Sequence, residues 1–282
     1  MKYKKNIYQT QFLNCILTLL VVSGVAGCAP KKDLSWVAIG DSITYLDAHP
    51  DEAGNRITKG YMARVAKKLP HIHYVNQGHN GWTSTEIAHS IEKLGIKKAD
   101  IYTVFLGTND WWRGIPLGKP GDTGDSTLYG AYHVIIKKLQ GMNNDAHIIL
   151  VTPVQRGDFV YIKNFKNTAY GSYKSKNGRT LAQFADAIKD ITQTEHLQLV
   201  DLYNHSGITP ANAVKYKRLR DTVTGQYKAY PYPVYTSVPF NPTTDDYPYP
   251  PDAIDMTYDG LHPSDKGFTV IADMLVKVMK KY

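Results

Sequence analysis

Apolar and polar positions alternate along the chain between two kinds of pattern. Short, nearly continuous apolar runs are typical of strands buried on both faces of a sheet. Five such runs occur: Leu34–Ile39, Ile72–Val75, Asp100–Leu106, His147–Thr152 and Leu197–Leu202. Between them, apolar residues recur at three- and four-residue spacing, which is typical of helices that bury one face. These stripes are Met62-Val65-Leu69, Ile87-Ile91-Leu94, Leu128-Ile135-Leu139, Leu181-Phe184-Ile188-Ile191 and Phe268-Ile271-Leu275-Val278.

Capping boxes mark the starts of two of these helices, because a threonine is followed three residues later by a glutamate or a glutamine. They are Thr83-x-x-Glu86 and Thr180-x-x-Gln183. Strands that alternate with helices form a parallel sheet with helices on both faces. The sequence therefore predicts the α/β class, with a three-layer α/β/α sandwich around a central parallel sheet of about five strands. We expect a single domain over residues 34–282, without internal repeats.

Two segments depart from this alternation of strand and helix patterns. Residues 156–177 are polar and aromatic, and residues 226–251 combine six tyrosines with seven prolines. Such proline density excludes an interior strand or helix, and the aromatic content argues against disorder. Long loops inside compact domains are often functional. We therefore predict an ordered Tyr/Pro-rich loop insertion over residues 204–258.

The N-terminal segment has the pattern of an export signal. Three lysines among the first five residues precede a mostly apolar stretch, Phe12–Ala26, which is short for a membrane-spanning helix. The following Val25-Ala26-Gly27-Cys28 resembles the lipobox of bacterial lipoproteins. In that interpretation residues 1–27 are the signal peptide, Cys28 receives a lipid, and residues 28–33 form a short tether. The protein is then anchored to a membrane of the bacterial cell envelope, facing the periplasm or the surface. The alternative is an ordinary secretory signal that happens to contain a cysteine.

Charge and cysteine content exclude several classes of function. Loss of residues 1–27 lowers the net charge from +8 to +5, and the remaining excess is spread over separate lysine pairs. No dense basic block points to a nucleic-acid partner. Only Cys15 and Cys28 are present, so the mature chain has neither an internal disulfide nor a cysteine-ligated metal. No glycine-rich phosphate-binding motif occurs, which leaves nucleotide binding without support.

Polar blocks follow the predicted strands at the points where ligands bind in parallel α/β sheets. The blocks are Gly40-Asp41-Ser42-Ile43, Asn76-Gln77-Gly78-His79-Asn80-Gly81, Gly107-Thr108-Asn109-Asp110 and, before the last helix, Asp259-Gly260-Leu261-His262-Pro263. If the fold is right, all four lie at one edge of the sheet. That edge then carries a serine, a glycine, an asparagine, an aspartate and a histidine.

Taken together and in this order, the four blocks resemble those of the SGNH, or GDSL-type, hydrolase family of serine esterases. The resemblance implies a flavodoxin-like fold and, together with the lipobox, a lipoprotein member of the family; no cofactor or metal is expected. It also implies a nucleophile at Ser42, a triad completed by Asp259 and His262, and an oxyanion hole formed by Ser42, Gly81 and Asn109. One departure is visible, because Ile43 follows the serine where the family name has leucine.

The residues themselves support the same chemistry. Ester cleavage needs a nucleophile, a base that takes its proton, and donors for the oxygen that becomes negative. Ser42 and Gly81, each placed before or at a helix start, would expose backbone N–H groups, and Asn109 would add a side-chain N–H. Asp259 is close enough in sequence to orient His262. Pro263 suits the first position of a helix, which would hold His262 at the helix start.

Several alternatives remain open from sequence alone. Ser42 could merely cap a helix, Gly81 could be an ordinary turn glycine, and Asn109 could bond a neighbouring loop. Asp255 competes with Asp259, and Asp201 with His205 forms a rival acid–base pair. Four residues flank the blocks and either line the substrate pocket or pack in the core: Trp82, Trp111, Trp112 and Arg113. Three histidines could suggest a metal site, but they lack the acidic partners that such a site needs: His71, His73 and His79.

The leading hypothesis is a lipid-anchored serine esterase that removes acyl groups, above all acetyl, from carbohydrates. A second hypothesis replaces the carbohydrate with a lysophospholipid or another lipid or aryl ester. A third is a non-catalytic glycan-binding lipoprotein. In the first hypothesis Tyr230, Tyr232 and Tyr235 contact the sugar, since a tyrosine offers a flat apolar face and a polar edge. The alternative is that these tyrosines pack against the domain.

Overall fold

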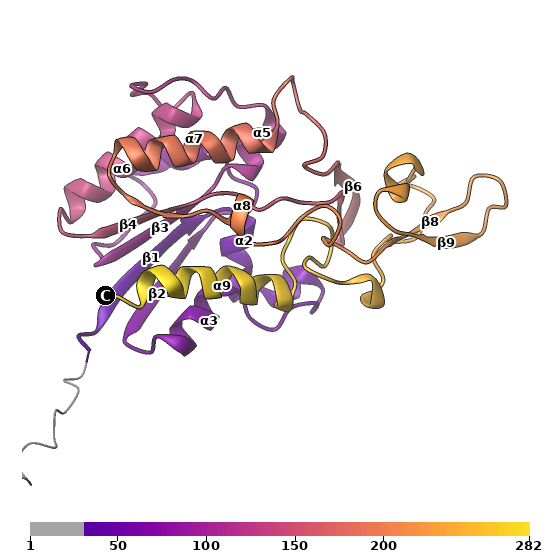
Figure 1. The fold of residues 1–282 in the computed structure, drawn as a ribbon, viewed down its shortest axis with the longest axis horizontal. Helices are drawn as coiled ribbons and strands as arrows, with labels where there is room; N and C mark the ends of the chain where they lie inside the picture. The colour runs from indigo at the N-terminus through magenta and orange to yellow at the C-terminus, as the bar shows by residue number, and fades with distance from the viewer. Residues whose placement is uncertain (1–30) are drawn as a thin grey trace, which may run out of the picture. The chain divides into compact units, whose positions relative to one another are not determined.

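The strand that leads to Ser42, β1 (Leu34–Gly40), lies between two parallel neighbours in a five-stranded sheet. The computed structural model describes residues 31–282, and Figure 1 shows their arrangement. The other strands are β2 (Ile72–Gly78), β3 (Ile101–Phe105), β4 (His147–Val151) and β7 (Gln198–Val200), in the order β2-β1-β3-β4-β7. All pairs are parallel, which confirms the predicted central sheet. Gly40 is aligned with Gly78 and Phe105, so the three strands end at the same level.

Helices cover both faces of the sheet, as the alternation of patterns predicts. The helices α3 (Tyr61–Lys68) and α9 (Asp265–Met279) pack on one face, together with side chains of β1 and β3. The opposite face is covered by α4 (Ser84–Ser90), α5 (Thr108–Arg113), α6 (Leu128–Met142) and α7 (Leu181–Thr194). The capping boxes at Thr83 and Thr180 are both formed. Each face therefore has its own apolar core.

Short elements complete the domain. The one-turn helices α2 (Ser42–Tyr45) and α8 (Leu202–His205) follow β1 and β7 directly. The remaining short turns are the 3₁₀ segments Leu46–Ala48, Pro50–Ala53, Val234–Ser237 and Pro251–Ala253. In the described part of the chain no helix has the length and apolar character needed to cross a membrane. The predicted signal peptide and Cys28 lie outside the described residues.

Residues 156–177 and the predicted insertion over residues 204–258 each contain an antiparallel hairpin that the apolar pattern does not predict. One hairpin pairs β5 (Phe159–Tyr161) with β6 (Asn164–Ala169), and the other pairs β8 (Lys217–Arg220) with β9 (Tyr227–Tyr230). Strands of three to six residues are too short to show a clear alternation. The second hairpin projects away from the sheet in Figure 1. Its surroundings form a small separate core of Val160, Val214, Leu219, Tyr235 and Tyr249.

Candidate active site

Ser42 is the first residue of α2, directly beyond the end of β1. Asp41 caps this short helix, because its Oδ1 accepts a hydrogen bond from the Ile43 N–H at 2.9 Å. A side chain at Gly40 would collide with Thr44 and approach the Phe105 carbonyl, so only glycine fits this turn. The turn therefore presents Ser42 at the carboxyl edge of the sheet with little freedom to move.

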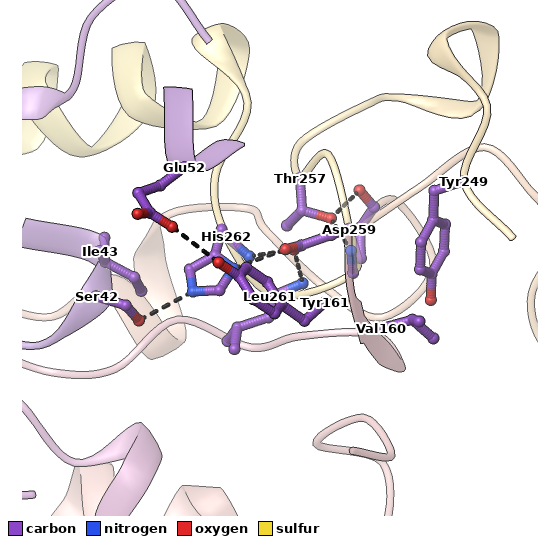
Figure 2. Close-up of polar contacts among 12 residues, drawn as sticks. Ser42, Ile43, Glu52, Val160, Tyr161, Tyr249, Thr257, Asp259, Leu261 and His262 are labelled. Atoms are coloured by element: carbon purple, nitrogen blue, oxygen red, sulfur yellow. Dashed lines mark hydrogen bonds and ion pairs between the residues drawn. The ribbon is translucent and has the colours of Figure 1, made fainter. Parts of the chain in front are cut away.

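His262 connects Ser42 to Asp259 through two hydrogen bonds (Figure 2). Its Nε2 lies 2.9 Å from Ser42 Oγ, and its Nδ1 lies 2.7 Å from Asp259 Oδ2. The other carboxylate oxygen of Asp259 accepts the backbone N–H groups of Leu261 and His262 at 3.0 and 2.7 Å. Asp259 is completely buried, whereas Ser42 and His262 keep 6% and 7% of their surface exposed. An aspartate so held fixes the orientation and the tautomer of the imidazole.

The turn from Tyr258 to Pro263, and not a helix start, holds His262. The helix α9 begins at Asp265 with Ser264 as its cap, so the prediction that Pro263 opens the helix was wrong. Proline's fixed φ suits extended backbone as well as a first helical turn, and Pro263 pairs with Thr257 in an isolated bridge. The ring of Tyr258 stacks on the His262 ring, with 5.8 Å between centroids, so the imidazole is held by packing as well as by hydrogen bonds.

Gly81 and Asn109 lie on the loops that follow β2 and β3. Gly81 has a φ of +77°, a conformation that favours glycine. Among the described residues none accepts a hydrogen bond from its N–H. Asn109 Nδ2 donates to the Trp82 carbonyl at 2.9 Å, which leaves one further N–H on the same nitrogen. The structure thus shows the loop bond that the sequence left as an alternative for Asn109, and this bond orients the side-chain amide.

Asp110 ties the same two loops together. Its carboxylate accepts the Ser84 N–H at 3.0 Å and the Ser84 hydroxyl at 2.5 Å, at the N-terminus of α4. Asp110 is completely buried, and this burial raises the pKa of its carboxyl to about 6. Asp41 is buried beside Ser42, and its burial raises the pKa to about 7. Both carboxyl groups thus have raised pKa values, and Asp110 joins the two loops beside Ser42.

The tryptophans and the arginine of α5 occupy three different environments. Trp111 is buried, and its Nε1 donates to the Arg179 carbonyl at 3.0 Å, so it joins α5 to the loop before α7. Trp112 is partly exposed and packs against the cluster that includes Leu261. Arg113 forms an ion pair of 2.8 Å with Glu86. Of these three, Trp112 is the side chain with exposed surface next to the His262 turn.

The three predicted substrate tyrosines form part of the small core of the insertion. Tyr235 is 99% buried, and its ring packs edge-on against Tyr232 at 5.8 Å. Tyr232 in turn contacts the ring of Tyr173. The hydroxyl of Tyr230 donates to Asp221 at 2.9 Å. These contacts match the alternative in which the tyrosines pack against the domain, and a role in substrate binding stays a prediction.

The rival acid–base and metal candidates have partners other than Ser42. Asp255 forms an ion pair with Lys266. Asp201 caps α8, and the nearest contact with His205 is 3.9 Å, on a histidine that is largely exposed. His79 stacks on Trp82, and burial lowers the pKa of its imidazole. Within residues 31–282 no group of three metal-binding side chains occurs.

Sequence reasoning missed the contribution of the segment that follows β4. The Phe159 and His262 rings meet edge to face, with 5.3 Å between centroids. The Tyr161 hydroxyl donates to Glu52 at 2.8 Å beside the same turn (Figure 2). Arg156 is 1% exposed, with its guanidinium 5.1 Å from the Trp111 ring. Burial lowers its pKa to about 10, so it stays charged at neutral pH. The sequence could have indicated this contribution only through the position of the segment, because it leaves the sheet at the edge where Ser42 lies.

Comparisons with known proteins identify the family of this chain. A model of the GDSL-like lipase/acylhydrolase family matches residues 38–270. A crystal structure of a possible lipase from Chitinophaga pinensis is 53% identical, covers 88% of this chain and 98% of its own, and superimposes with a TM-score of 0.87. An acetyl xylan esterase is 18% identical, covers 87% of this chain and 99% of its own, and has a TM-score of 0.52. No curated protein matches the chain.

The fold and the match over most of the chain define an enzyme that hydrolyses carboxylic esters. The chain belongs to the GDSL-like lipase/acylhydrolase family. The family resemblance and the fold inferred from the four sequence blocks are both confirmed. The third hypothesis, a binding protein without catalysis, is thereby set aside.

Proposed function

We propose that Ser42, His262 and Asp259 are the catalytic triad of this esterase. The observation that carries the proposal is the continuous pair of hydrogen bonds from Ser42 Oγ through the imidazole to Asp259, at 2.9 and 2.7 Å. As Ser42 Oγ forms a bond to the ester carbonyl carbon, its proton passes to His262 Nε2. His262 then gives this proton to the alcohol oxygen as the ester C–O bond breaks. Water activated by the same nitrogen releases the acyl group from Ser42.

The proposed oxyanion hole consists of the backbone N–H groups of Ser42 and Gly81 and the second N–H of Asn109 Nδ2. These groups come from the ends of β1, β2 and β3, which the register places at one level. The bond from Asn109 to the Trp82 carbonyl fixes the amide before substrate binds. Donors that need no reorganisation during the reaction stabilise a developing negative charge most effectively.

Carbohydrate acetyl esters are the substrate class that we propose. The supporting observation is that the partly exposed side chains on the elements around Ser42 include aromatic residues with polar edges: Trp82, Trp112 and Tyr161. Flat rings bind the C–H face of a sugar, and their N–H and O–H groups bind its hydroxyls. The acetyl xylan esterase shares only the fold at 18% identity, so the proposal does not rest on it.

The alternative substrate is a lysophospholipid or another lipid or aryl ester. It is favoured by one comparison, because the relative from Chitinophaga pinensis at 53% identity is described as a possible lipase. The two substrates differ in the length of the acyl group that the site must accept. A lipid ester needs an extended apolar surface for its chain, whereas an acetyl group needs room for one methyl.

Hydrolysis rates of p-nitrophenyl esters from acetyl to palmitoyl, together with acetylated xylo-oligosaccharides, distinguish these substrates. We expect kcat/KM to fall steadily as the acyl chain lengthens and acetate to be released from the oligosaccharides. The Ser42→Ala variant is the control for spontaneous hydrolysis. A rate that rises with chain length, with no acetate released from the oligosaccharides, would establish the lipid alternative.

We also propose that Cys28 is lipidated after cleavage of residues 1–27 and anchors the enzyme to a membrane of the cell envelope. The support is the sequence Val25-Ala26-Gly27-Cys28 behind a basic and then apolar leader. One acyl chain gives only marginal membrane binding, so a stable anchor requires the several chains of a mature lipoprotein.

A further inference from the structure

Trp112 lies between the edge of the sheet that carries Ser42 and a basic surface on the loop of residues 170–180. Asn109 and Trp112 are three residues apart in α5 and therefore share one face of this helix. Trp112 also packs against the cluster of Phe159 and Leu261, and the Phe159 ring touches the His262 ring. Trp112 thus lies on the same face of α5 as Asn109 and packs beside the turn that carries His262.

Residues 170–180 form the other side of this surface and are held against α5. The Trp111 Nε1 donates to the Arg179 carbonyl at 3.0 Å, and the Arg179 guanidinium donates to the Ile115 carbonyl at 2.9 Å. The Tyr170 ring meets the Trp112 ring edge-on, with 4.9 Å between centroids. The loop position is therefore fixed by contacts with the same helix that carries Asn109.

Three cations meet at these rings. Lys176 Nζ lies 4.3 Å from the centroid of Trp112, and Lys174 Nζ lies 5.7 Å from that of Tyr170. Arg156 lies 5.5 Å from Trp112, and its Nη2 donates to the Tyr170 carbonyl. Its Nε is buried without an acceptor in the described part of the chain.

No carboxylate of the described residues forms an ion pair with any of these three cations. The segment 170–180 contains two lysines and one arginine but neither aspartate nor glutamate. The nearby Asp158 is engaged elsewhere, by the Tyr173 hydroxyl at 2.6 Å and by Lys217 at 3.2 Å. The rings hold the ammonium groups of Lys174 and Lys176 in place by cation–π attraction, and these two groups remain available to an anion from solution, whereas Arg156 is buried.

We propose that this surface, formed by Trp112, Tyr170, Lys174 and Lys176, binds the carboxylate of a uronic acid in the acetylated carbohydrate substrate. The inference rests on the proposed carbohydrate acetylesterase function and narrows its substrate to acidic oligosaccharides. The sugar that carries the ester lies at Ser42, and a uronate on the same chain reaches the lysines beyond Trp112. Attraction between exposed charges is modest, and it weakens as salt shortens the range of the field.

The test compares two acetylated xylo-oligosaccharides that differ in one charge. One carries a glucuronate side group, and in the other this group has been reduced to glucose. The readout is the ratio of their kcat/KM values. We expect a ratio of about three- to tenfold in favour of the acidic substrate at low salt, as two exposed ion pairs would give. The ratio should fall toward one in 0.5 M sodium chloride.

Variants of the two lysines test whether they cause the preference for the acidic substrate. The double variant Lys174→Met/Lys176→Met should bring the ratio close to one, and Lys174→Arg/Lys176→Arg should retain it. The control Lys67→Met removes one exposed charge from α3, on the other face of the sheet, and should leave the ratio unchanged. A double methionine variant that keeps the preference would overturn the proposal.

The outcomes also separate this inference from the function on which it rests. If the wild type cleaves both oligosaccharides at equal rates, the uronate inference fails and the acetylesterase proposal stands. If it cleaves neither, or cleaves an anionic lysophospholipid faster than both, the two proposals fail together.

Discussion

The side-chain amide of Asn109 donates a hydrogen bond of 2.9 Å to the main-chain carbonyl of Trp82, which joins the loop after β3 to the loop after β2. Gly81 immediately precedes Trp82, so this bond fixes the distance between two of the proposed oxyanion donors. One nitrogen atom thus serves both as a structural support and as a candidate donor to the substrate.

Replacement of Asn109 by alanine removes both contributions. We expect kcat to fall about 10²–10³-fold, which is typical for the loss of one oxyanion donor, with a much smaller change in KM. Initial rates with p-nitrophenyl acetate measure this effect, and thermal unfolding checks the fold. A variant with normal kcat would show that Asn109 only holds the Trp82 loop.

Removal of the Ser42 hydroxyl should abolish hydrolysis without unfolding the protein. The Ser42→Ala variant is expected to lose on the order of 10⁴–10⁶-fold in turnover, and His262→Ala should fall to a similar level. The double variant should be little slower than either single variant, because the two residues act as a unit. If a folded Ser42→Ala protein hydrolyses esters at a rate near that of the wild type, the proposed triad is wrong.

The pH dependence of stability should report the buried carboxyl of Asp110. Its pKa in the folded protein is about 6, above the ordinary value of 3.8. The folded state therefore binds this proton more tightly than the unfolded state, so its stabilising contribution is complete below pH 3.8 and is lost as the pH rises to about 6.

An Asp110→Asn variant cannot ionise at this position. As the pH rises from 4 to 7, the difference between its free energy of unfolding and that of the wild type, measured with urea, should increase by up to about 3 kcal/mol in favour of the variant. A difference in stability that does not change with pH would contradict the raised pKa.

Tyr235 should matter more for folding than for the choice of substrate. Because its ring is almost fully buried in the core of the insertion, Tyr235→Ala is expected to cost about 3–5 kcal/mol of stability. Any remaining activity should drop equally on acetylated oligosaccharides and on p-nitrophenyl acetate. A selective loss on the oligosaccharides would instead support the predicted contact between this tyrosine and the sugar.

Lipidation at Cys28 is tested in cells. The Cys28→Ser variant should leave the membrane fraction and stay active in solution, because the cysteine lies outside the domain that hydrolyses the ester. Fractionation at high salt, followed by an esterase assay, measures both properties. If the variant remains with the membrane, the anchor lies elsewhere.

The sheet and the His262 turn could be predicted because their signals are local in sequence. β1 and β3 are almost entirely apolar, and Asp259 stands only three residues before His262. The first residue of α9 could not be predicted with the same accuracy. Pro263 and Ser264 both suit helix starts. The structure makes Ser264 the cap, because its Oγ accepts the Gly267 N–H and Pro263 pairs with Thr257.

Arg156 shows what a linear pattern leaves out. It opens a polar segment that also contains several lysines, and nothing adjacent to it in sequence indicates burial. The rings of Trp111 and Trp112 and the carbonyl of Tyr170, all distant in sequence, create its environment. Likewise, a sequence rich in tyrosine and proline does not indicate whether the rings face a substrate or pack against one another, as the ring of Tyr235 does.

The distance along the chain between the proposed nucleophile and its base has a consequence for biosynthesis. Ser42 and His262 are separated by 220 positions, and four strands of the sheet follow β1 before the His262 turn is made. A nascent chain therefore displays the serine long before the histidine that would activate it exists. A fragment that ends before residue 262 should be chemically inert toward esters, so hydrolysis begins only when the last segment closes over the sheet.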